Sequence, residues 1–137
     1  MTQNATEPLA IDAFGLTKIY GSGNTEVVAM CDASMQVAQG EVVALLGPSG
    51  SGKSTFLTAV GLINPPTSGR ITIKGQLVLD GETAQANLRS FRRQHIGFIF
   101  QKSNLIPFLS AAENVQIAME LNGETRNFAR RRAIELM

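Results

Sequence analysis

A glycine-rich run at residues 47–55 carries the residue types that bind phosphate groups, in the pattern G-x-x-x-x-G-K-[ST]. Glycines let successive backbone N–H groups point into one concavity, and the positive end of a following helix adds to their attraction for phosphate. The pattern predicts a nucleoside triphosphate site, in which Lys53 reaches the β- and γ-phosphates and the Ser54 hydroxyl ligates Mg²⁺. The predicted binding residues of this loop are Gly47, Pro48, Ser49, Gly50, Ser51, Gly52, Lys53, Ser54 and Thr55.

Such a loop requires a strand before it and a helix after it. Residues 41–46 are apolar and β-branched, which predicts that strand. Residues 53–62 predict the helix, with a buried face formed by Phe56, Leu57, Val60 and Leu62. This context favours a phosphate-binding loop over a flexible turn rich in glycine and serine.

The remaining sequence alternates strand and helix patterns and predicts an α/β fold. Further strands are expected at residues 10–20, 27–37, 70–74, 76–79 and 96–100. Helices are expected at residues 87–94, 110–121 and 126–137, and Ser110 with Glu113 forms the capping box of the second. The buried face of the third is expected to consist of Ala129, Ala133, Leu136 and Met137. Residues 1–9 are expected to be a flexible tail and residues 10–137 the domain.

The composition is that of a globular protein, with 44% hydrophobic residues and a net charge of +1 across 137 residues. A balance so close to neutral does not favour nucleic acid as a partner. No apolar run is long enough to span a membrane, and the N-terminus does not resemble a signal peptide. Cys31 is the only cysteine, so it is expected to be a small buried residue in a protein of a reducing compartment.

Four further segments resemble the nucleotide-binding domain of ABC transporters: Leu-Thr-Lys-Ile-Tyr at 16–20, Gly-Glu at 40–41, Pro-Thr-Ser-Gly at 66–69 and Ile-Gly-Phe-Ile-Phe-Gln at 96–101. The resemblance covers residues 11–137. It implies an incomplete P-loop NTPase fold of the ABC type. That fold comprises an antiparallel β subdomain, part of a parallel core sheet and the start of a helical subdomain. Residues 101–107 with 113–115 are similar to the branch that includes lipoprotein-release, macrolide and glycolipid exporters.

The resemblance also implies roles for two residues outside the loop. Tyr20 would stack on the adenine of ATP, and Gln101 would contact Mg²⁺ and the attacking water. The Gln101 loop would dock against transmembrane permease subunits, and a second nucleotide-binding subunit would complete a dimer. This places the protein in the cytoplasm, peripheral to the inner or plasma membrane. Alternatively, Tyr20 packs a strand end and Gln101 is a surface loop residue. His95 is expected to be a half-exposed residue at a strand edge, without a catalytic role.

The resemblance implies an ATP-binding, energy-coupling component of an exporter, with hydrolysis driving transport in the complete protein. The Leu-Ser-Gly-Gly-Gln signature, the Walker B strand and the switch histidine are not found in the sequence. We therefore expect an N-terminal portion, with Lys53 and Gln101 contributing to catalysis but little or no ATPase activity alone. Two alternatives stay open, a truncated nucleotide-binding fragment without turnover and a P-loop NTPase of another class. The guanine-reading Asn-Lys-x-Asp motif is not found either.

Overall fold

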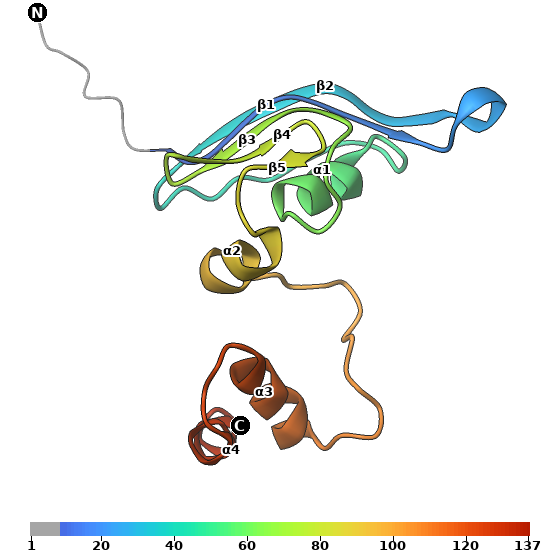
Figure 1. Cartoon of the computed structure of the whole chain (residues 1–137). Coiled ribbons are helices and arrows are strands. Elements are labelled where there is room, and N and C mark those ends of the chain that lie inside the picture. Colours follow the sequence, from blue (N-terminus) through green and yellow to red (C-terminus); the bar gives the residue numbers. More distant parts are fainter. Residues whose placement is uncertain (1–8) are drawn as a thin grey trace, which may run out of the picture. The chain divides into compact units, whose positions relative to one another are not determined.

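The computed structural model describes residues 9–137, which form two compact units (Figure 1). The first unit ends at Arg92, and the second is Arg93–Met137. The expected N-terminal tail lies outside the described residues except for Leu9, which is the first residue of a strand. Within residues 9–137, no helix combines the length and the apolar character needed to cross a membrane.

A five-stranded antiparallel sheet dominates the first unit. Its strands lie in the order β2-β1-β3-β4-β5. They are β1 (Leu9–Tyr20), β2 (Val27–Ala38), β3 (Ser68–Ile73), β4 (Gln76–Asp80) and β5 (Thr83–Ala84), and the short 3-10 helix η1 (Gly23–Thr25) joins the first two. The predicted strands at 10–20, 27–37, 70–74 and 76–79 are therefore confirmed, because each has an antiparallel neighbour close by in the sequence.

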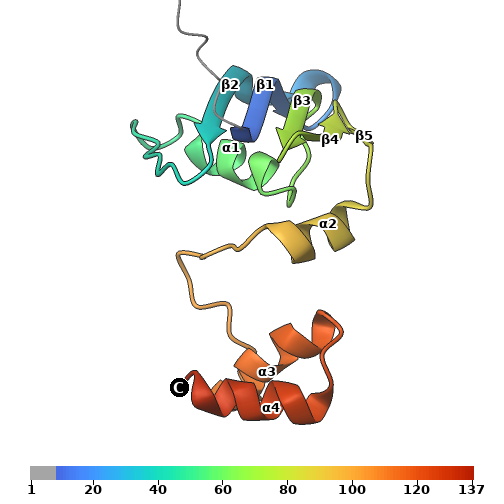
Figure 2. The same cartoon turned by 90° about the vertical axis from the view of Figure 1, so that its left-hand side faces the viewer.

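Helix α1 (Lys53–Val60) lies against one face of this sheet, as Figure 2 shows. The apolar core forms between them. Its buried members are Ala13, Leu16, Phe56, Ala59, Val60, Leu62, Ile71, Ile73, Val78 and Leu79. The predicted buried face of the helix is confirmed for Phe56, Val60 and Leu62, whereas Leu57 is exposed. The helix also ends earlier than expected, at Val60, and Leu62 takes the left-handed conformation with φ of 57°.

Two predicted strands are wrong. Residues 41–46 and 96–100 are irregular, and Val42 is 95% exposed and Ile99 98% exposed. A strand is stabilised by hydrogen bonds to neighbours on its sides, and a parallel strand buried on both faces needs two of them. No strand described in residues 9–137 pairs with either segment. Apolar, β-branched sequence alone is therefore not sufficient to make these segments extended.

The prediction for Cys31 is also wrong, because its side chain is exposed. The register between β1 and β2 shifts at this point, between the pairs Leu16–Ala33 and Lys18–Met30. Asp32 adopts φ of 46° there, which is the left-handed region. This bulge interrupts the alternation of side chains, so Met30 faces the core while Cys31 faces outward.

Helix α2 (Leu88–His95) confirms the helix expected at 87–94. Asn87 caps its start, since its Oδ1 accepts a hydrogen bond from the Ser90 N–H at 3.0 Å. Phe91 is buried, and the Arg92 guanidinium donates to the Leu62 carbonyl at 2.5 Å. His95 is the last residue of this helix and is exposed, so its predicted place at a strand edge is wrong.

The second unit contains the helix pair α3 (Ala111–Leu121) and α4 (Arg126–Glu135). The predicted capping box is confirmed, because Ser110 Oγ accepts from the Glu113 N–H and the Glu113 carboxylate accepts from the Ser110 N–H. Ala129 and Ala133 are fully buried, as expected. Leu136 and Met137 are exposed, which corrects the predicted buried face. The reason is that α4 ends at Glu135, before these residues can continue its apolar side.

Candidate functional site

The phosphate-binding loop depends on glycine at two positions for steric reasons. Gly47 has φ of 152° and Gly52 has φ of 86°. A Cβ atom on Gly47 would lie 2.9 Å from Ser51 Oγ, and one on Gly52 would lie 2.8 Å from the Ala29 carbonyl oxygen of β2. Both distances are too short for a carbon atom. The two glycines of the sequence pattern therefore fold the loop and press it against the sheet.

Helix α1 begins directly after this loop and presents its positive end there. Gly52 is its N-cap residue, no side chain accepts from its first turn, and that turn has no acidic residue. The first N–H groups of a helix have no partner within the helix. They and the helix dipole attract anions, so this helix end fits a phosphate group.

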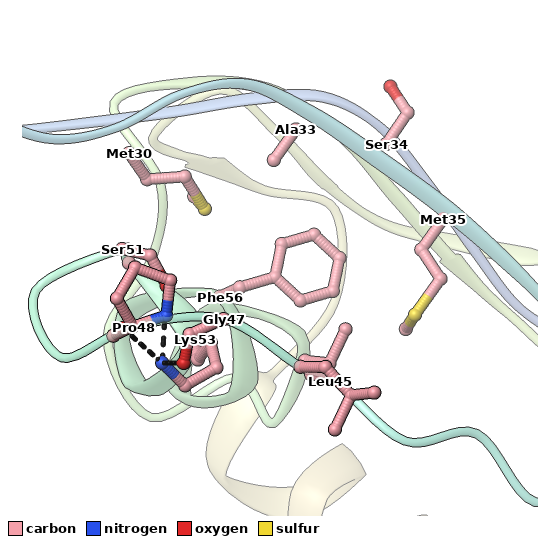
Figure 3. A pocket seen from close by; sticks show the side chains of 12 residues that line it. Met30, Ala33, Ser34, Met35, Leu45, Gly47, Pro48, Ser51, Lys53 and Phe56 are labelled. Carbon is pink, nitrogen blue, oxygen red and sulfur yellow. Dashed lines mark hydrogen bonds between the residues drawn. The ribbon is translucent and has the colours of Figure 1, made fainter.

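Lys53 folds back over the loop (Figure 3). Its ammonium group donates to the Gly47 carbonyl at 2.8 Å, the Pro48 carbonyl at 2.6 Å and Ser51 Oγ at 3.1 Å. Phosphate oxygens are charged and therefore stronger acceptors than these neutral groups. Lys53 is thus positioned to exchange its loop contacts for the oxygens of a bound phosphate.

Ser54 lies in the first turn of α1 and is exposed. Its hydroxyl is a hard oxygen ligand of the kind that Mg²⁺ accepts, and Mg²⁺ bound beside phosphates needs few protein ligands. Within residues 9–137 there is no group of three or more His, Cys, Asp and Glu side chains that could hold a metal ion. The chemistry of the Ser54 hydroxyl is therefore compatible with a Mg²⁺ ion bound beside phosphates.

A cavity of about 450 Å³ lies between β2 and the loop. Figure 3 shows Phe56 pointing from α1 toward β2 at its centre. Most of the side chains around it are apolar, and they are Met30, Ala33, Met35, Leu45, Leu46 and Phe56. Apolar walls do not suit phosphate groups, because they leave buried charge without hydrogen bonds. The N–H-rich start of α1 therefore suits a phosphate group better than the apolar part of this cavity does.

Tyr20 is the last residue of β1 and belongs to the same unit as the loop. It follows Leu16 and Lys18 at intervals of two residues, and alternate side chains of a strand lie on the same face. Leu16 is fully buried, so this is the face that α1 covers. Met30, the strand partner of Lys18, lines the cavity beside the loop. The structure thus places Tyr20 and the loop on one side of the sheet.

Gln101 lies in the second unit, in an irregular segment, and is exposed. Its expected contact with Mg²⁺ stays a prediction.

Asn114 is a structural residue of the same unit whose role the sequence did not reveal. Its side chain accepts from the Ile106 N–H at 2.8 Å and donates to the carbonyls of Ile106 at 3.2 Å, Leu109 at 3.1 Å and Ser110 at 3.0 Å. These bonds fasten the end of the Gln101 segment to α3. In the sequence, only the position of Asn114 next to the capping-box residue Glu113 pointed to this structural role.

The pKa of Glu113 is lowered in this structure. The Ser110 hydroxyl and backbone N–H both donate to its carboxylate, and these bonds hold the pKa of Glu113 below its ordinary value of 4.5. The positive charges of Arg126 and Arg130 act in the same direction. Glu113 is therefore an ionised cap at neutral pH and not a candidate proton donor.

Comparison with known proteins places the chain in a family. The family described as "ABC transporter" matches residues 30–136. The chain is 43% identical over 132 residues to the macrolide export ATP-binding/permease protein MacB of Hyphomonas neptunium, covering 96% of this chain and 20% of that protein. It is 38% identical over 133 residues to the lipoprotein-releasing system ATP-binding protein LolD of Chromohalobacter salexigens, covering 97% of this chain and 55% of that protein.

Solved structures agree. Two structures of MJ0796, described as dimeric ATP-binding cassettes, superpose with TM-scores of 0.78 and 0.79. They share 34% and 35% identity with this chain and cover 91% of it and 54% of MJ0796. One of them is described as bound to ADP and Pi. The chain therefore spans about half the length of a cassette, and it belongs to the ABC transporter family.

Proposed function

We propose that this chain is the ATP-binding, energy-coupling part of an ABC transporter of the exporter type, in which ATP hydrolysis drives transport in the complete protein. The observation that carries the proposal is the loop itself: glycine-dependent geometry, a helix start without a side-chain cap, and Lys53 turned onto the loop. The exporter assignment is supported by the similarity to MacB and LolD.

Each part of the loop has a role in this proposal. Backbone N–H groups at the start of α1 bind the phosphates, Lys53 neutralises the β- and γ-phosphates, and Ser54 ligates Mg²⁺. Tyr20 stacks on the adenine, which fits its partly exposed ring at the end of β1. Gln101 contacts the metal and the attacking water. MgATP supplies the phosphoryl group for hydrolysis.

The partners follow from the same proposal. The Gln101 loop docks against permease subunits, which gives the protein a cytoplasmic position at the inner or plasma membrane. A second nucleotide-binding subunit completes the assembly, in line with the dimeric description of MJ0796. The residues named here bind and orient ATP, but none of them is a base for water, and Gln101 is neutral. We therefore expect negligible turnover from these residues alone.

The first prediction concerns Lys53. The 137-residue chain should bind MgATP, and Lys53→Ala should weaken binding about ten-fold to a hundred-fold, because a charged hydrogen-bond donor to phosphate is lost. Displacement of a fluorescent ATP analogue measures this. Lys74→Ala, an exposed lysine in the β3–β4 turn, is the matched control and should have no effect. Tighter binding of GTP than of ATP, or equal binding by Lys53→Ala, would contradict the proposal.

A further inference from the structure

We propose that Lys18 and Asn64 are positioning residues for Tyr20, which fix its ring in one orientation for stacking on the base of a bound nucleotide. The inference rests on the proposed function and adds to it a base-recognition group of three residues: Lys18, Tyr20 and Asn64. Only Tyr20 was expected from the sequence.

The first step is the position of Tyr20 itself. It is the last residue of β1 and is 43% exposed. A side chain so exposed at a strand end ordinarily samples several rotamers. Here two neighbours restrain it: the Asn64 side-chain amide donates to its phenol oxygen, and the Lys18 ammonium lies 5.4 Å from the ring centroid. The first contact fixes the tip of the ring, and the second is a cation–π contact with its face.

Both neighbours are themselves held. The Lys18 ammonium also donates to the Pro65 carbonyl at 2.6 Å. The Asn64 backbone N–H donates to the Thr58 carbonyl of α1 at 3.1 Å. The Lys18 ammonium and the Asn64 backbone are therefore held by the protein itself, and both contacts with Tyr20 are present without a nucleotide.

The connection that carries Asn64 is fastened to the same strand as Tyr20. The Thr67 N–H donates to the Thr17 carbonyl at 2.8 Å, and Thr67 Oγ1 accepts from the Ile19 N–H at 3.1 Å. Residues 64–67 thus run beside the end of β1. Asn64 also lies in the turn after α1, the helix whose start is the proposed phosphate site, so in this proposal one helix connects the two ends of a bound nucleotide.

The consequence is a preorganised aromatic surface. Stacking on an aromatic side chain contributes to nucleotide binding whatever the base, because every base has a π-face. A ring that is already fixed loses less conformational entropy when the base binds. Lys18 lies over one face of the ring and Tyr20 is 43% exposed, so the proposed place for the base is the opposite face of the ring. Lys18 and Asn64 should therefore raise the affinity for the base without touching the phosphates.

The test compares two ligands on the full 137-residue chain by isothermal titration calorimetry: MgATP, and Mg-tripolyphosphate, which has no base. Tyr20→Ala should weaken MgATP about ten-fold. Asn64→Ala and Lys18→Met should each weaken it about three-fold to ten-fold. All three should leave tripolyphosphate affinity unchanged, which also shows that the loop is folded. Lys74→Met is the matched control for Lys18→Met.

A double-mutant comparison isolates the hydrogen bond. Tyr20→Phe removes only the phenol oxygen that Asn64 contacts, so Asn64→Ala should cause no further loss in that background. Equal losses for ATP and tripolyphosphate would make Lys18 and Asn64 ordinary structural residues and overturn the inference. The inference is also overturned if Asn64→Ala and Lys18→Met leave the affinity for ATP unchanged while Tyr20→Ala weakens it. In that case the proposed function survives. If Tyr20→Ala itself leaves ATP binding unchanged, or the wild-type chain binds no ATP, the proposed role of Tyr20 or the proposed function fails instead.

Discussion

At the residue scale, the loop shows that two glycines with similar backbone angles can be required for different reasons. Gly50 has φ of 82° and Gly52 has φ of 86°. A Cβ atom on Gly50 would meet nothing within 4 Å, whereas one on Gly52 would meet the Ala29 carbonyl. Gly50 is therefore needed only for its backbone conformation, and Gly52 is needed also for contact between the loop and β2.

A pair of variants separates these two effects. Gly50→Ala should cost about 1 to 2 kcal/mol of unfolding free energy, which is the strain of a left-handed residue with a side chain. Gly52→Ala should cost more, because the same strain is joined by a clash with backbone that cannot move away cheaply. Urea unfolding of both variants measures the difference. Equal losses would mean that the contact with β2 is not tight in solution.

At the scale of elements, local signals decided which predictions succeeded. The capping box of α3 and the cap of α2 involve residues three apart, so the sequence contains the whole interaction. The segments at 41–46 and 96–100 depend on strand neighbours, and their apolar sequence could not supply those. The prediction for Cys31 is wrong because a β-bulge lies beside it. A bulge depends on how two strands pair, so the sequence of one strand does not reveal it.

The capping box also gives a pH prediction. The pKa of Glu113 is lowered in the folded chain, so its ionised form is favoured by folding. This contribution is fully present above the ordinary value of 4.5 and is lost as the pH falls through the lowered folded-state value. Glu113→Gln should therefore reduce the stability of α3 at pH 7, and the difference from wild type should shrink as the pH falls below 4.5.

Thr125 provides the matched control, because it caps α4 through its hydroxyl alone. Thr125→Ala should weaken its helix by about 1 kcal/mol with little dependence on pH. Thermal unfolding followed by far-ultraviolet circular dichroism, in a pH series that runs downward from neutral, measures all three proteins. A constant difference between Glu113→Gln and wild type across this range would show that the carboxylate does not act through its charge.

At the scale of the whole molecule, the described chain consists of two units that each have their own packing. The first buries a sheet against α1, and the second pairs α3 with α4. The sequence predicted one domain and not two units, but it did predict most of their helices and strands, because the contacts that stabilise these are mostly between neighbouring elements. It could not predict the contact of Asn64 with Tyr20, since the two residues are 44 positions apart and no periodic pattern connects them.

Exposed apolar side chains give the prediction at this scale. Ile99 is 98% exposed and Ile71 is fully buried. Ile99→Thr should change the unfolding free energy by less than about 0.5 kcal/mol and should reduce the binding of an apolar dye. Ile71→Thr, the same substitution in the core, should cost about 2 to 4 kcal/mol. Chemical denaturation and dye fluorescence test both. A large loss for Ile99→Thr would show that residues 96–100 are packed in solution.

The short length of α1 has a consequence for how a nucleotide binds. Its eight residues span about 12 Å, with the phosphate-binding loop at one end and the turn that holds Tyr20 beyond the other. In the proposed mode of binding, the loop holds the phosphates and the Tyr20 ring holds the base, so the nucleotide is a bivalent ligand. Once its phosphates bind, its base reaches the Tyr20 ring at a high effective concentration. Two weak contacts can then combine into tight binding. A ligand that has only the phosphates or only the base makes one contact and gains nothing from the second.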